Sequence, residues 1–160
     1  MAQLSQEKSA PAGFQPDQFF LSRTDGAGVV RDFAGRLLRR CVISTIGRWD
    51  HQYGAMHFDE TFAFDDGRVD TLNWTFSRDP QGRMVASEPS VTSKVRGWRD
   101  GPDYRLRFKR PGDPPLGGLE VTYDVRFTPL ERTVVLKVAR LKLLGLTLGA
   151  MTAYHRQVEA

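Results

Sequence analysis

The sequence contains one cysteine, Cys41, among its 160 residues, so no disulfide can form within the chain. A chain of this length can bury enough apolar surface to fold as one domain without such a bond. Cys41 lies in Leu37-Leu38-Arg39-Arg40-Cys41-Val42-Ile43, where a cysteine more often packs as a small hydrophobic side chain than reacts as a nucleophile. The sequence therefore excludes a disulfide-bonded scaffold and gives no support for thiol chemistry.

Motifs of the common enzyme classes are also missing. The chain has no Gly-x-Ser-x-Gly nucleophile elbow and no Walker-type or dinucleotide-binding glycine loop. His51, His57 and His155 lack the cysteines or carboxylates that would complete a familiar metal site, so we expect them at surface or loop positions. We therefore expect no metal and no cofactor, and we favour a protein without enzymatic activity.

No segment has the composition of a secretory signal or of a simple membrane-spanning helix. Residues 1–18 are polar and have no basic region followed by an apolar run. The longest apolar stretch, Val134 to Met151, is interrupted by basic side chains. We expect residues 1–18 to be disordered or to wrap around a single domain formed by residues 19–160. The predicted location is cytoplasmic, with peripheral contact to a membrane as the alternative.

The charge balance is mildly basic, with 23 Lys and Arg residues against 19 Asp and Glu residues and a net charge of +4. The basic residues are scattered, and only Arg39-Arg40 and Lys109-Arg110 are adjacent pairs. Scattered charge does not form the polybasic cluster that binds nucleic acid or anionic lipid strongly. We expect no nucleic-acid partner and only weak attraction to an anionic membrane surface.

Turn signals recur at short intervals along the chain, which is typical of an all-β domain. The hairpin signal Asp65-Asp66-Gly67 joins two segments that alternate between apolar and polar residues, as half-buried strands do. Alternation around Val91 and Val95 predicts a further strand. Sequential hairpins with one apolar face each predict an antiparallel up-and-down β-barrel of eight or nine strands. A barrel of this size can enclose one small ligand.

The apolar positions of these segments predict the side chains that face the interior and bind a ligand. They are Phe58, Phe62, Phe64, Leu72, Trp74, Phe76, Tyr104, Leu106, Phe108, Tyr123, Val125 and Phe127.

Glu60 shares the apolar face of its strand with Phe58 and Phe62, where a carboxylate is costly unless it is paired or protonated. Arg140 follows Val134, Leu136 and Val138 at the same two-residue spacing, so we expect it to point inward as well. We hypothesise that Glu60 and Arg140 pair inside the barrel or bind the polar head of an apolar ligand. The alternative places Glu60 at a wet rim or turns it outward through a β-bulge.

The stretch from Phe58 to Gly67, Phe-Asp-Glu-Thr-Phe-Ala-Phe-Asp-Asp-Gly, resembles the bacterial domain of unknown function family 3833, whose members are often labelled putative lipoproteins. Gly26 to Arg36 resembles the opening strand and turn of that family, and Trp74 and Leu144-Gly145 resemble later positions. The resemblance covers Phe19 to Tyr154. It implies a lipocalin-like barrel and no known activity, and the genomic company of the family hints at membrane-lipid modification. The signal and lipidated cysteine usual in the family are missing from this sequence.

Three functions stay open at this point. The first, which we prefer, is a barrel that binds a lipid or another apolar small molecule without catalysis. The second is an isomerase or cyclase that acts on a lipid with Glu60 as general acid or base. The third is an accessory subunit of a lipid-modifying complex, whose interior is filled by its own side chains. The first is preferred because the alternation of apolar and polar residues predicts an apolar interior, and because the sequence contains no familiar catalytic motif.

Overall fold

The computed structural model describes residues 13–112 and 116–158, which form ten antiparallel strands in one sheet and one short helix. The expectation that residues 1–18 are disordered or wrap around the domain concerns mainly residues 1–12, which lie outside the described residues. No helix in the described ranges is long and apolar enough to cross a membrane. In chain order the elements are α1 (Pro16–Phe19), β1 (Thr24–Asp32), β2 (Leu37–Asp50), β3 (Ala55–Phe64), β4 (Val69–Arg78), β5 (Met84–Ser87), β6 (Arg96–Asp100), β7 (Asp103–Pro111), β8 (Glu120–Glu131), β9 (Val134–Leu143) and β10 (Leu146–Gln157).

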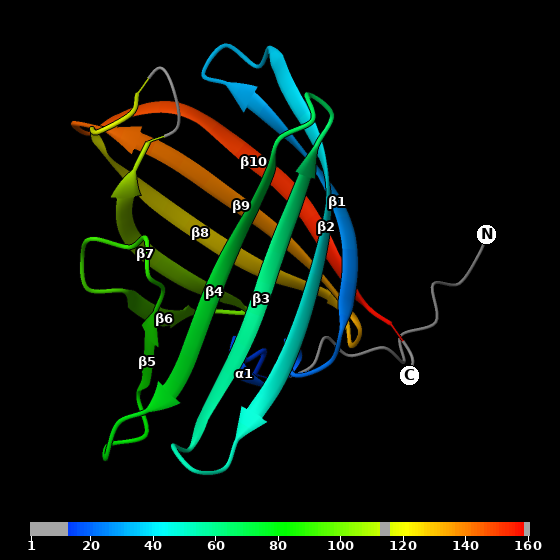
Figure 1. The fold of residues 1–160 in the computed structure, drawn as a ribbon, viewed down its shortest axis with the longest axis vertical. Coiled ribbons are helices and arrows are strands. Elements are labelled where there is room, and N and C mark those ends of the chain that lie inside the picture. The colour runs from blue at the N-terminus through cyan, green and yellow to red at the C-terminus, as the bar shows by residue number, and fades with distance from the viewer. Residues whose placement is uncertain (1–12, 113–115, 159–160) are drawn as a thin grey trace.

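The sheet curls into a nearly closed barrel (Figure 1). Strands that follow one another in sequence pair with one another, and β1 pairs with β10 from Thr24–Gln157 to Asp32–Gly149. The sheet order therefore begins at β5 and ends at β6, and these two short strands meet at the seam without a hydrogen-bonded ladder between them. The predicted antiparallel up-and-down barrel is confirmed, but it has ten strands rather than eight or nine.

The strand predicted around Val91 and Val95 is wrong, because this segment has irregular backbone between β5 and β6. Glu88 and Pro89 stop the regular structure there. The Glu88 carboxylate accepts a hydrogen bond of 2.7 Å from the backbone N–H of Ser90 and so stabilises a turn, and Pro89 has no N–H to offer a ladder. The seam of the barrel consequently lies beside an irregular segment.

The burial of side chains follows the two-residue period of the strands. On β4, Leu72, Trp74 and Phe76 are buried while Asn73 between them is exposed. The buried rings also pack across the interior of the barrel, as with Trp74 on β4 and Phe108 on β7, whose ring centroids lie 5.2 Å apart. Each fully buried large apolar side chain contributes about 1.5–3 kcal/mol. The inner faces of the strands therefore form one continuous core.

A short plug, formed by α1 and Phe20, covers one end of the barrel (Figure 1). The ring of Phe20 stacks on Phe58 at a centroid distance of 4.8 Å, and Phe14 packs against Phe19 at 5.4 Å. A Cβ at Gly47 would lie 1.8 Å from the carbonyl oxygen of Phe20. Glycine at position 47 therefore allows the plug backbone to cross directly over β2.

Candidate ligand-binding cavity

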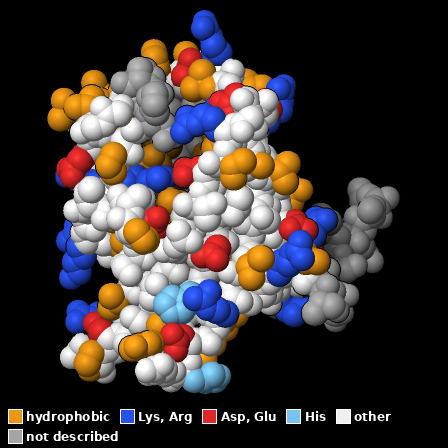
Figure 2. Space-filling view, in the orientation of Figure 1, with side chains coloured by type: hydrophobic (Ala, Val, Ile, Leu, Met, Phe, Trp, Pro, Cys, Tyr) orange, Lys and Arg blue, Asp and Glu red, His pale blue; other side chains and the backbone are white. Residues whose placement is uncertain are grey.

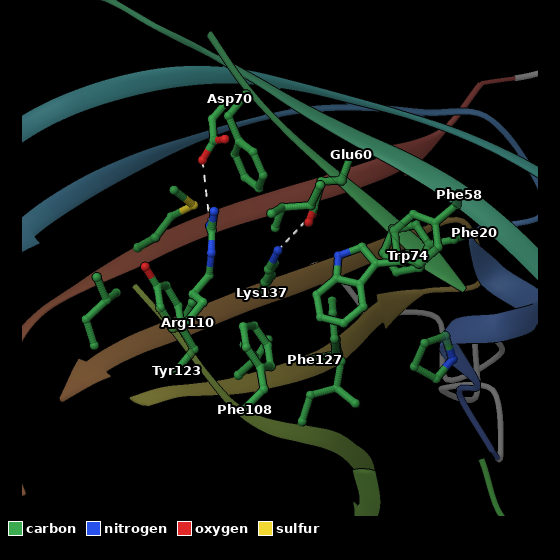
Figure 3. Close-up of a pocket in the computed structure, with 18 of the residues that line it drawn as sticks. Phe20, Phe58, Glu60, Asp70, Trp74, Phe108, Arg110, Tyr123, Phe127 and Lys137 are labelled. Carbon is green, nitrogen blue, oxygen red and sulfur yellow. Dashed lines mark hydrogen bonds and ion pairs between the residues drawn. The ribbon is translucent and has the colours of Figure 1, made fainter. Parts of the chain in front are cut away.

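A cavity of about 90 Å³ lies inside the barrel, between the plug and the opposite end (Figure 3). Side chains from α1 and from most of the long strands form its wall, and most of them are aromatic or aliphatic. The wall contains nearly all of the predicted interior residues: Phe58, Glu60, Phe62, Phe64, Leu72, Trp74, Phe76, Leu106, Phe108, Tyr123, Val125 and Phe127. The alternation in the sequence thus located the inner faces of β3, β4, β7 and β8. That these residues contact a ligand stays a prediction.

Tyr104 is buried but lies outside the wall of the cavity. Its hydroxyl donates to the sulfur of Met84 at 3.7 Å, so the side chain packs toward the seam beside β5. Burial raises the pKa of the Tyr104 hydroxyl. Tyr104 therefore belongs to the core and does not face the cavity.

Arg140 is exposed on the outside of the barrel, so the prediction that it points inward is wrong. The pairing of β8 with β9 shifts register between Pro129 and Glu131, and Val134 and Val135 are both buried in succession. The inward face of β9 consequently begins at Val135 rather than at Val134. A phase error of one residue exchanges the two faces of a strand. Lys137, not Arg140, is the basic residue that β9 places in the cavity wall.

Glu60 and Lys137 form an ion pair in this wall (Figure 3). Lys137 Nζ donates to Glu60 Oε2 at 2.8 Å, and the two residues are 7% and 3% exposed. The Nζ atom also lies 5.3 Å from the ring centroid of Phe62. The prediction of an inward Glu60 that pairs with a basic residue is correct for the carboxylate and wrong for its partner. A buried pair of this kind is favourable only when both charges are present.

His155 lies fully buried behind this pair. Its Nε2 is 3.6 Å from Glu60 Oε2, and its Nδ1 is 3.3 Å from Thr24 Oγ1, which in turn lies 2.6 Å from Thr45 Oγ1. Burial lowers the pKa of His155 to about 4, although the charge of Glu60 acts in the opposite direction. The imidazole is therefore neutral at pH 7.

The surface position expected for His155 is therefore wrong. The signal that could have placed it inside was its two-residue spacing from the apolar Ala153.

A second polar group lies at the end of the cavity opposite the plug. Arg110 Nη1 is 3.7 Å from Asp70 Oδ2, and the guanidinium carbon is 5.7 Å from the ring centroid of Tyr123 (Figure 3). The guanidinium of Arg39 lies 4.1 Å from the ring centroid of Phe64.

Sequence reasoning missed both arginines of this group because it treated the basic residues as scattered charge and assigned none of these side chains to the interior. The alternation nevertheless contained the signal, since Arg110 is in phase with the inward-facing Phe108.

Two further kinds of chemistry can be assessed in the described ranges. No group of three or more His, Cys, Asp or Glu side chains there could hold a metal ion. Cys41 is buried, its sulfur lies 3.8 Å from the carbonyl oxygen of Gly28, and burial raises the pKa of its thiol. A thiol with a raised pKa is a poor nucleophile at neutral pH. Cys41 acts as a small core side chain.

Comparisons with known proteins agree with this architecture. The barrel is similar to the S-type phycobiliprotein lyase CPES from Guillardia theta, with a TM-score of 0.60 and 9% sequence identity over 92% of this chain and 94% of that chain. At this identity the likeness supports the lipocalin-like fold alone. No curated protein matches the sequence significantly. The model of DUF3833, described as a protein of unknown function, matches residues 1–157 and confirms the family resemblance drawn from the sequence.

Proposed function

We propose that this chain, which belongs to the DUF3833 family of proteins of unknown function, is a binding protein whose barrel holds a lipid or another apolar small molecule. The observation that carries this proposal is the cavity, whose wall is mainly aromatic and aliphatic with a few polar side chains at defined places. That composition is usual for small-molecule sites. The polar groups would orient the ligand, and the apolar wall would supply most of the affinity.

The size of the cavity restricts the ligand. Its volume of about 90 Å³ is below the roughly 300–1,000 Å³ that is common for drug-sized ligands. A bound molecule must therefore be slender, or it must displace side chains from the wall. A single alkyl chain meets these conditions with the fewest displaced side chains, since it has the smallest cross-section among lipid tails. We therefore propose a single-chain lipid as the ligand class.

The same small volume favours a second candidate function, an accessory subunit whose own side chains fill the barrel. The stacked rings of Phe20, Phe58 and Phe76 occupy much of the plug end, with neighbouring centroids 4.8 and 5.3 Å apart. The enzyme alternative has less support. The Glu60 carboxylate that would act as general acid or base is already engaged by Lys137 at 2.8 Å.

We also propose weak contact between the end opposite the plug and an anionic membrane surface. The β1–β2 and β9–β10 hairpin tips lie at this upper end, where hydrophobic side chains gather near basic ones (Figures 1 and 2). Phe33 on the first tip is 82% exposed and lies between Arg31 and Arg36 in the sequence, and Leu144 on the second is 95% exposed. Exposed apolar tips beside basic residues suit peripheral membrane contact.

The Leu144 side chain is held at a φ of 50°, a conformation that asparagine or glycine adopts more easily. The stability of the fold does not require an exposed leucine in a strained turn, so contact of this side chain with the membrane explains it better.

Native mass spectrometry of the freshly purified protein, followed by organic extraction and lipid analysis, tests the binding function. Ala139→Leu adds an isopropyl group to the cavity wall, and Ala63→Leu adds the same group on the exposed face of β3. We expect a bound lipid in the wild type and in Ala63→Leu, and its loss in Ala139→Leu. A wild-type protein that carries no lipid and binds none of a panel of fatty acids and phospholipids would favour the accessory subunit instead.

A further inference from the structure

The two polar groups of the cavity differ in how completely their hydrogen bonds are made. Lys137 and Glu60 lie in the middle of the cavity, carry opposite charges and are joined at 2.8 Å. This pair is electrically balanced, and each charge has a hydrogen-bonded partner of opposite sign. The polar end of a ligand therefore has little to gain by reaching it.

Arg110 is not satisfied in this way. Its side chain is 15% exposed, and its Nε lies buried without a hydrogen-bond partner among the residues that the structure describes. The Asp70 carboxylate is 3.7 Å from Nη1, which is longer than a hydrogen bond. A buried guanidinium N–H without an acceptor is unfavourable until a ligand or water supplies one. Arg110 thus offers a donor toward the cavity.

A second guanidinium lines the same end of the cavity. Arg39 comes from β2, across the barrel from β7, and its guanidinium lies against the ring of Phe64. Its Nη1 is 3.9 Å from Asp66 Oδ2. The two aspartates balance the arginines in charge, but neither of these contacts is a hydrogen bond. An acidic group at this end could accept a charge-assisted hydrogen bond from Arg110, whose Nε has none among the described residues, and would lie within the positive field of both guanidinium groups.

The wall between this end and the plug is apolar apart from the Lys137–Glu60 pair. Figure 3 shows that pair between Phe20 on one side and Arg110 with Asp70 on the other. A chain that begins at Arg110 would pass Phe108 and Trp74 before it reaches the plug. The cavity therefore has a polar end at Arg110 and a mainly apolar wall that leads from this end to the plug.

We propose that Arg39 and Arg110 recognise the acidic head of a single-chain lipid, a carboxylate or a phosphate monoester, whose tail extends toward the plug. This inference rests on the proposed binding function. It goes beyond that function by naming the head group, its orientation and the residues that select it. Arg110 presents a planar set of donors that matches either head geometry.

Titration calorimetry with three ligands of equal chain length tests the inference. Palmitic acid and hexadecyl phosphate carry an acidic head, and hexadecanol carries a neutral one. We expect the wild type to bind both acidic lipids at least about tenfold more tightly than the alcohol, since a hydrogen bond to a charged group is lost with the neutral head. The preference between acid and phosphate identifies the source of the head group.

The variants separate the arginine site from the cavity. Arg110→Gln and Arg39→Gln should each reduce affinity for the acidic lipids by about tenfold and leave affinity for hexadecanol unchanged. Arg140→Gln removes an exposed arginine on the outside of β9 and should change neither affinity. Thermal unfolding of each variant checks that it folds.

Two other outcomes are informative. Equal binding of acid and alcohol by the wild type, or an equal loss of both in Arg110→Gln and Arg39→Gln, would overturn the head-group site and leave the binding function standing. Failure of all three lipids to bind would overturn the binding function and the head-group site together.

Discussion

Lys137 Nζ lies 2.8 Å from Glu60 Oε2, and both side chains are buried in the wall of an otherwise apolar cavity. The two residues are on β9 and β3, far apart in the sequence. Their attraction must offset the cost of removing both charges from water, which such pairs often only just achieve. Removing one of the two residues should therefore cost more stability than the intact pair contributes to the barrel.

Lys137→Met should destabilise the protein by about 3–5 kcal/mol, because it leaves the Glu60 carboxylate buried without its partner. Glu60→Gln should be destabilising for the same reason, since it leaves the ammonium unpaired. The double variant should recover most of the loss, because neither side chain then carries a charge. Urea denaturation of the four proteins measures this coupling. Losses that simply add in the double variant would contradict the pair as described.

His155 should make the stability of the barrel fall as the pH is lowered. Its folded pKa of about 4 is below the ordinary value of 6.5, so the unfolded chain binds the extra proton between these two values. The contribution is fully present above pH 6.5 and is lost by about pH 4. One pKa unit corresponds to about 1.4 kcal/mol, so the whole shift amounts to about 3 kcal/mol.

The difference in unfolding free energy between the wild type and His155→Gln, measured by urea denaturation from pH 4 to 7.5, isolates this effect from the carboxylates. The difference in unfolding free energy should decrease as the pH is lowered across this range. His51→Gln makes the same substitution at an exposed histidine and is the matched control for the change of side chain. A flat difference for His155→Gln would show that its imidazole is not buried in the neutral form.

The alternation of apolar residues was enough to predict the barrel and the inner faces of four strands. It worked where one face is clearly polar, as on β4, where Asn73 and Thr75 separate Leu72, Trp74 and Phe76. It failed on β9, where apolar residues occupy both faces and a register shift lies just before the strand. Sequence spacing does not reveal such a shift, because it depends on the pairing of two strands.

The polar side chains of the site were harder to predict than its apolar wall. Arg110 and His155 are both in phase with inward-facing neighbours, but arginine is usually exposed and histidine is only intermediate in burial. Their burial depends on partners from distant strands, such as Asp70 for Arg110 and Thr24 for His155. Those partners become neighbours only when the barrel closes.

Gly47→Ala should displace the plug. The added methyl group would lie 1.8 Å from the carbonyl oxygen of Phe20, so the backbone of one segment must move. We expect a loss of about 1–3 kcal/mol, as for other overpacked positions, and faster hydrogen exchange in residues 14–20. Gly117→Ala is the control, because no atom lies within 4 Å of its added Cβ and its φ is not positive. Equal exchange in the two variants would show that the plug does not depend on this close approach.

Leu144→Asn should separate folding from membrane contact at the β9–β10 tip. Leu144 and Gly145 have φ values of 50° and 81°, and asparagine tolerates a positive φ better than leucine. Thermal unfolding should therefore show a stabilisation of up to about 1 kcal/mol. Co-sedimentation with vesicles containing phosphatidylglycerol should show weaker binding, because a 95% exposed apolar side chain has been removed.

Tyr53→Asn removes another exposed apolar side chain, from the β2–β3 turn at the plug end, and should leave vesicle binding unchanged. Binding of the wild type should also weaken at high salt, because the basic residues near the β1–β2 tip contribute through electrostatics that salt screens. If Leu144→Asn were stabilised and still bound vesicles like the wild type, the strained leucine would have no role at the membrane. The proposed contact at this end would then have to rest on Phe33 alone.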